Sequence, residues 1–134
     1  MDKIDRKILE YLRENGRAAY TDIAESAGVS EGTVRNRVDR MLDDGVIERF
    51  TVETSDTGVA AVVMIEVSTD RDIAGLVEEF PGDIEVDEVT GEYDLVARVS
   101  RETTEDLNDE IDRIRGVDGV ESTTTFSVLK SHGL

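Results

Sequence analysis

The chain has 134 residues, with 32 Asp and Glu against 15 Lys and Arg, so its formal net charge at pH 7 is −17. It has no cysteine, which excludes disulfides, thiolate metal sites and a cysteine nucleophile. No apolar run is long enough to cross a bilayer and the N-terminus lacks a signal-peptide pattern, so we expect a cytoplasmic protein with no membrane partner.

The negative charge is unevenly distributed along the chain. Residues 1–50 hold 9 Lys and Arg against 11 Asp and Glu, whereas the remaining residues hold 6 against 21. The acidic residues do not form one tail but are spread over surface positions. We interpret this composition as the surface of a protein from a salt-rich cytoplasm, where the Debye length falls to roughly 3 Å at about 1 M salt. An ordinary acidic protein is the alternative.

The first 45 residues predict three short helices. Apolar residues at helical spacing predict a first helix over about residues 3–14, which Asn15-Gly16 ends. The second helix, about residues 20–26, has a poor N-cap because Ala19 offers no side-chain acceptor. Ser30 is a good N-cap for the third helix, and Gly45 suits its C-terminal end. The expected buried stripe of this third helix is Val34, Val38, Met41 and Leu42.

A short strand is expected after the third helix, over residues 46–52. Three helices with a glycine turn before the third, followed by a strand, indicate a winged helix-turn-helix over residues 1–52. Residues 53–58 are the predicted linker, and residues 59–134 the second domain.

The second domain alternates strands and helices in the order β-α-β-β-α-β, which predicts a ferredoxin-like α+β fold. Strands are expected over residues 59–67, 84–89, 93–99 and 120–129. Thr69 is the expected cap of the first helix, and Thr103 or Thr104 that of the second. This order places both helices on one face of an antiparallel sheet. Because the opposite face needs cover, we expect a homodimer.

The third helix concentrates Arg35, Arg37 and Arg40 around Asn36 in an otherwise acidic chain. Arg and Asn can make paired hydrogen bonds to guanine and adenine in a major groove. The alternative is a solvated helix face whose arginines pair with nearby acidic residues. We favour DNA contact, with Thr33, Asn36 and Arg37 at base edges. The expected phosphate contacts are Arg35, Arg40, Arg17, Thr21 and Ser30.

With both halves placed, the chain resembles the Lrp/AsnC (feast/famine) transcription regulators over essentially its whole length. A haloarchaeal member would account for the acidic composition. The resemblance implies a regulator that binds double-stranded DNA at a roughly palindromic operator, forms dimers through the sheet domains and often assembles further into octamers. It rests on Ile4–Leu9, Asn15–Arg17, Ala27–Ser30, Thr33–Val38, Gly45–Ile47 and Thr90–Leu95.

The same resemblance implies an effector site, for an amino acid or a related metabolite, near the turn that begins at Gly91. Asp94 would accept the effector's ammonium group, and turn amides would hold its carboxylate. The alternatives are a hairpin turn chosen for backbone geometry and threonines chosen for strand propensity. The expected effector residues are Gly91, Glu92, Tyr93, Asp94, Thr123 and Thr125.

Two rival functions remain open at this stage. One is an enzyme similar to the sirohaem decarboxylases that resemble this family, although the chain has only one histidine, His132. The other is a sensing or assembly module whose helix-turn-helix does not bind DNA. We expect no metal site, because no loop has the ligand spacing of a cation site. We also expect no cofactor and no catalytic residue.

Overall fold

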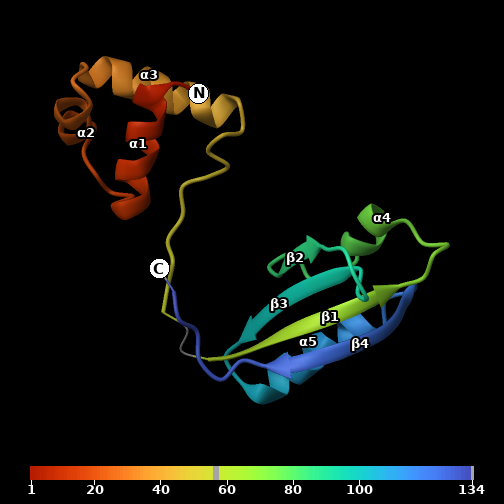
Figure 1. Ribbon diagram of the computed structural model, residues 1–134. Helices are drawn as coiled ribbons and strands as arrows, with labels where there is room; N and C mark the ends of the chain where they lie inside the picture. Colours follow the sequence, from red (N-terminus) through yellow and green to blue (C-terminus); the bar gives the residue numbers. More distant parts are fainter. Residues whose placement is uncertain (56–57, 134) are drawn as a thin grey trace. The chain divides into compact units, whose positions relative to one another are not determined.

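The computed structural model describes residues 1–55 and 58–133 and contains two compact units (Figure 1). Unit 1 comprises Met1–Thr54 and unit 2 comprises Ser55–Leu134. The boundaries of these units differ by a few residues from those of the predicted domains, residues 1–52 and 59–134. The predicted linker, residues 53–58, includes residues 56 and 57, which lie outside the described residues.

Unit 1 contains three helices whose ends follow the predicted capping signals. They are α1 (Lys3–Glu14), α2 (Tyr20–Ala27) and α3 (Glu31–Asp43). Asn15 is the C-cap of α1, and Ala19, the N-cap of α2, makes no side-chain cap hydrogen bond, as predicted. The Ser30 side chain accepts a hydrogen bond from the Thr33 N–H and so caps α3. Gly45, just beyond α3, has a φ of 76°, which favours glycine.

The apolar core of unit 1 joins the three helices. Its buried members are Ile8, Ile23, Ala24, Val34, Val38 and Met41. Leu42, which we expected in this core, is 37% exposed. Consecutive helical residues point about 100° apart. Since Met41 faces the core together with Val38, its neighbour Leu42 turns out towards solvent.

The strand predicted over residues 46–52 does not form, so that prediction is wrong. Residues 46–55 are all described and none belongs to a strand. A strand needs a neighbouring strand to accept its hydrogen bonds, and unit 1 offers no other. Val46, Phe50 and Val52 therefore remain exposed in this segment.

Unit 2 is a four-stranded antiparallel sheet with the predicted β-α-β-β-α-β order (Figure 1). The strands lie side by side in the order β2-β3-β1-β4, which makes β2 and β4 the edges. The register places Ala61 opposite Val99 on one side of β1 and opposite Ser127 on the other. The elements are β1 (Val59–Val67), α4 (Ile73–Val77), β2 (Glu85–Glu88), β3 (Leu95–Arg101), α5 (Thr104–Arg115) and β4 (Val120–Ser127).

Both helices of unit 2 pack against the same face of the sheet. Leu76 of α4 and Ile111 of α5 join one buried cluster with Val63 and Ile65 of β1. The opposite face, which we call the open face, carries the alternate residues of each strand. Its apolar members are Val62, Met64, Val96 and Phe126.

The helix caps of unit 2 agree in part with the sequence. Thr103 caps α5 by accepting a hydrogen bond from the Asp106 N–H. The N-cap of α4 is Asp72 and not Thr69. Asp72 directly precedes the helical residues, and its carboxylate accepts a hydrogen bond from the Gly75 N–H. Thr69 lies earlier, in the turn that follows β1.

The close packing of Gly58 against β3, at the start of unit 2, can be tested by substitution. A methyl group on Gly58 would lie 2.2 Å from the Arg101 carbonyl oxygen, whereas one on Gly82 would meet nothing within 4 Å. We expect Gly58→Ala to lower the free energy of unfolding by roughly 1–3 kcal/mol through overpacking. Gly82→Ala should leave it unchanged or raise it by up to about 1 kcal/mol. Urea unfolding of the two variants is the measurement, and equal midpoints would contradict this contact.

Candidate nucleic-acid interface and effector turn

One side of α3 presents three polar side chains, two of which have no partner among the described residues. Thr33, Asn36 and Arg40 follow i, i+3, i+7 spacing, which places them on one side of the helix. Asn36 and Arg40 are exposed, and neither side chain makes a hydrogen bond or ion pair with the residues that the structure describes. Thr33 Oγ1 lies 2.9 Å from Ser30 Oγ, so the helix cap also orients the Thr33 hydroxyl.

Arg35 is held on the side of α3 that faces α2. Its guanidinium lies over the Tyr20 ring, 5.5 Å from the ring centroid. Its Nη2 atom also lies 2.5 Å from Glu31 Oε1, one helical turn earlier. A cation over an aromatic face is attracted by the ring quadrupole. These contacts orient Arg35 while leaving more than half of its side chain exposed.

Arg37 points to the N-terminus of α1, where we had expected it to face a base edge. Its Nη1 atom lies 2.5 Å from Asp2 Oδ2 and 3.3 Å from Asp5 Oδ1. These two aspartates form the capping box of α1: Asp2 Oδ1 accepts the Asp5 N–H and Asp5 Oδ2 accepts the Asp2 N–H. The network therefore connects the start of α1 with the middle of α3.

The charges in this network shift the pKa values of their groups. The hydrogen bond from Arg37, followed by that from the Asp5 N–H, lowers the pKa of Asp2 from 3.8 to about 2. The hydrogen bond to Asp2 in turn raises the pKa of Arg37. Both shifts favour the charged forms, so the contact is an ion pair over the whole physiological range.

The other expected phosphate-binding residues lie at the surface of unit 1. Arg17, Thr21 and Ser30 are exposed. The Arg17 N–H donates to Asn15 Oδ1 at 3.1 Å, which shapes the turn between α1 and α2. Ser30 is already used as the α3 cap, and its hydroxyl lies at the N-terminal end of the helix. A helix N-terminus with a hydroxyl is a favourable place for a phosphate.

The turn between β2 and β3 carries four of the six expected effector residues, and three of these four have a structural role in the turn. Gly91 has a φ of 118°, a conformation that favours glycine. Asp94 Oδ2 accepts the Val67 N–H at 2.7 Å, so this carboxylate secures the end of β1. Tyr93 reaches across to β4, where its hydroxyl lies 2.9 Å from Thr124 Oγ1.

The structure separates the threonines of β4 onto two faces. Thr123 and Thr125 pair with Ile65 and Val63, so they share the helix-covered side, and Arg115 Nε donates to Thr123 Oγ1 at 3.2 Å. Thr124 lies on the open face with Tyr93. Our expected set omitted Thr124 and Arg115. The alternation of side chains along β4 could have identified Thr124, but no local signal pointed to Arg115.

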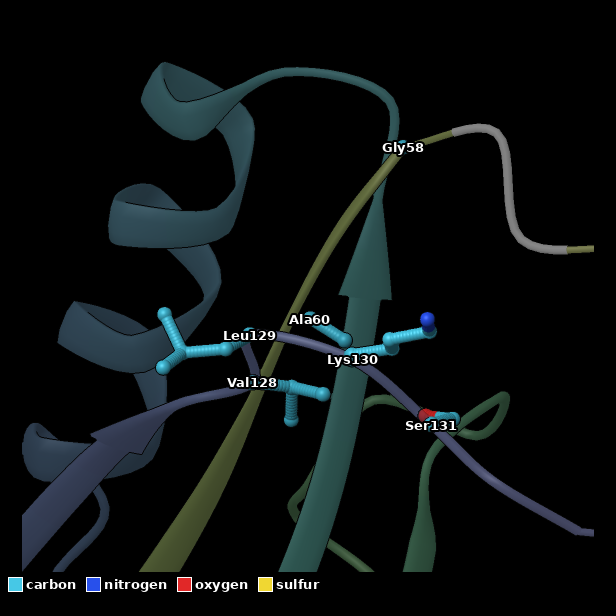
Figure 2. A pocket seen from close by; sticks show the side chains of 6 residues that line it. All are labelled: Gly58, Ala60, Val128, Leu129, Lys130 and Ser131. Carbon is cyan, nitrogen blue, oxygen red and sulfur yellow. The ribbon is translucent and has the colours of Figure 1, made fainter.

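The described residues of unit 2 form, among others, two surface pockets. One of about 350 Å³ lies between the start of β1 and the segment after β4, and Figure 2 shows Leu129 and Lys130 pointing to opposite sides of that segment. The other, of about 290 Å³, is at the end of α5 and includes Arg115 and Thr123. Of the expected effector residues, Thr123 alone lines either of these two pockets.

The described residues contain neither a cluster that could hold a metal ion nor a helix that could cross a membrane. Within residues 1–55 and 58–133, no three His, Asp or Glu side chains are grouped so that they could hold a metal ion. In the same part of the chain, no helix has the length and apolar character needed to cross a membrane.

The helix-turn-helix and the sheet unit together define a two-domain, DNA-binding transcription regulator. Residues 1–48 match the family description "Winged helix-turn-helix DNA-binding". Residues 60–133 match "Lrp/AsnC ligand binding domain". The chain therefore belongs to the Lrp/AsnC family of transcription regulators, as the sequence predicted.

Several known regulators are similar over nearly the whole chain. The HTH-type transcriptional regulator FL11 of Pyrococcus furiosus is 33% identical, with 98% of this chain and 91% of FL11 covered. LysM of Saccharolobus solfataricus is 35% identical, with 98% and 95% covered. The structure of E. coli AsnC superposes with a TM-score of 0.81 at 27% identity, and the match covers 100% of this chain and 95% of AsnC. These relatives favour the regulator over the decarboxylase-like enzyme and the module without DNA binding.

The ion pair between Asp2 and Arg37 predicts a specific titration. Because the pKa of Asp2 in the folded chain is about 2, the pair contributes fully above the usual value of 3.8 and is lost as pH falls from there through 2. In an Arg37→Ala variant the pKa of Asp2 should rise towards 3.8. NMR titration of the Asp2 carboxyl measures both values. A wild-type pKa near 3.8 would show that the pair is not populated.

Proposed function

We propose that α3 enters the major groove of an operator and that Thr33, Asn36 and Arg40 make its central contacts. The observation that carries this proposal is the unengaged polar side of α3, where Asn36 and Arg40 have no partner among the described residues. Asn36 can pair with an adenine edge and Thr33 can contact a neighbouring base. The proposed phosphate contacts are Arg40, Arg35, Arg17, Thr21 and Ser30.

Two copies of the chain would bind the operator together. The open face of the sheet carries Val62, Met64 and Val96 at its centre, and a second copy of the same face is the proposed cover. Two linked DNA-binding units then require a roughly palindromic operator, with half-sites about 34–36 Å apart. Octamers assembled from such dimers are the further expectation for this family.

Binding would depend on short-range contacts rather than on long-range attraction. The DNA-binding half is close to neutral, with 9 basic and 11 acidic residues in positions 1–50. Counterion release weakens as salt rises, so a protein of a salt-rich cytoplasm must rely on dehydrated contacts and on two linked half-sites. We place the protein in the cytoplasm, with chromosomal DNA.

An amino acid is the proposed effector. A transcriptional regulator of Neisseria meningitidis, solved as a complex with L-Met, has the same fold, with a TM-score of 0.83 at 23% identity. The match covers 100% of this chain and 93% of that regulator. In this chain the backbone amides of Gly91, Glu92 and Tyr93 could hold a carboxylate. Asp94 is engaged by the Val67 N–H, so an effector ammonium would share that carboxylate. Thr123 and Thr125 would contribute from the other side of β4.

Substitution of Asn36 tests the DNA contact. The operator is first selected from random DNA with the full-length wild-type protein. Asn36→Ala should weaken operator binding about 10- to 100-fold and relax preference at one base pair, because a paired contact is lost. Arg40→Ala should weaken binding about equally for all sequences. Fluorescence anisotropy measures both, with Asn108→Ala, an exposed asparagine of α5, as the matched control. Unchanged binding by Asn36→Ala would refute the proposed contact.

A charge on the open face tests the dimer. Phe126 lies on this face and is exposed, so Phe126→Asp should leave the fold intact but shift the protein towards monomer. Ser127→Asp adds the same charge to an exposed residue on the other face of β4 and is the control. Analytical ultracentrifugation measures both variants, and repeating the wild-type run with each free amino acid tests the effector. A Phe126→Asp dimer as tight as wild type would place the interface elsewhere.

A further inference from the structure

Arg37 differs from the other polar residues of α3 because α1 engages its guanidinium. The Arg37 Nη1 atom contacts one carboxylate oxygen of Asp2 and one of Asp5. The two remaining oxygens accept the backbone N–H groups of the capping box, at 3.0 and 3.3 Å. Each of the four carboxylate oxygens therefore has a donor within this network. Such a set of bonds defines one orientation of the Arg37 side chain.

Burial makes this arrangement difficult to exchange for a DNA contact. The Arg37 side chain is 21% exposed and that of Asp5 only 10%. A buried carboxylate needs a charged or hydrogen-bonding partner, because desolvation without one is costly. If Arg37 turned to a base, Asp5 would keep its negative charge without that partner. A DNA phosphate could not replace the arginine, since it is negative as well.

The position of Arg37 on α3 also favours its contact with α1. Consecutive residues of a helix point about 100° apart, so Arg37 is turned away from the direction of Asn36. It lies on the side of α3 that meets the start of α1, whereas Asn36 and Arg40 are exposed. Arg37 comes four residues after Thr33 and three before Arg40, so it borders the polar side of α3 at the edge that meets the start of α1.

We propose that Arg37 is a positioning residue, which sets the orientation of α3 against α1 and does not read a base. The proposal rests on the function proposed above and refines it, since Thr33 and Asn36 then make the base contacts while Arg40 contacts a phosphate. It also replaces our expectation from the sequence that Arg37 contacts a base edge. Asp5 becomes part of the DNA-binding apparatus without touching DNA.

The opposite charges of the two partners provide a sharp test. Asp5→Asn removes a negative charge from the DNA-binding unit, and electrostatics alone would then strengthen DNA binding. Positioning predicts the reverse: Asp5→Asn and Arg37→Gln each weaken operator binding by about tenfold. The loss should be uniform over the selected operator and its single base-pair variants, as expected when no base contact is removed. Anisotropy titrations of full-length proteins supply these values.

The double variant Asp5→Asn, Arg37→Gln separates positioning from base reading. It leaves no buried charge unpaired, and the two amides can hydrogen-bond to each other. We expect it to bind the operator at least about threefold more tightly than Arg37→Gln alone, a coupling typical of residues in contact. An arginine that reads a base could not be rescued by a change in α1.

Three outcomes distinguish the proposals. If the wild-type protein enriches no DNA sequence, the proposed function and this inference both fail. If it does, but Arg37→Gln flattens the preference at one base pair while Asp5→Asn binds as tightly as wild type, only this inference fails. If Arg37→Gln does not fold, Arg37→Lys takes its place, because lysine keeps a charge for Asp5 but lacks the guanidinium fork. An unchanged base preference in Arg37→Lys supports positioning, and a changed one overturns it.

Discussion

The ion pair between Arg37 and the two aspartates at the start of α1 is the contact on which the DNA-binding unit depends. The apolar core behind it, including Ile8, Val34 and Val38, holds the helices together but is non-directional. A guanidinium bound to two capped carboxylates has a defined geometry, because each of its bonds has a preferred direction. Packing therefore brings α3 against α1, and the ion pair sets its orientation.

Two of the three arginines of α3 make contacts within the DNA-binding unit, which bears on how an acidic chain can bind DNA. Arg35 lies over Tyr20 and Arg37 is bound to α1, which leaves Arg40 exposed without a partner among the described residues. With so few available cations, long-range attraction is weak, and each specific contact contributes a larger share of the affinity. In the dimer proposed above, pairing through the open sheet face would compensate by joining two weak half-sites.

Much of the fold was predictable from the sequence because it depends on local signals. Helix α1 begins and ends where its apolar spacing and Asn15 indicated, and the β-α-β-β-α-β order followed from alternating patterns. The contacts that the sequence did not reveal join residues distant in the chain. The Arg37–Asp2 pair is separated by 35 residues, and no local pattern reveals it. The bond between Asp94 and the Val67 N–H is equally non-local. The expectation that Asp94 binds an effector came from the family resemblance and stays a prediction.

The close approach of Gly58 to the Arg101 carbonyl also bears on how such regulators can be recombined. Because a side chain at residue 58 would meet the backbone of β3, this glycine belongs to the packed sheet unit and not to an interchangeable connector. Val59, the next residue, already pairs with Arg101 in the ladder. In a chimaera that joins a foreign DNA-binding head to this sensing domain, the junction therefore belongs before Gly58, so that the glycine remains with the sheet.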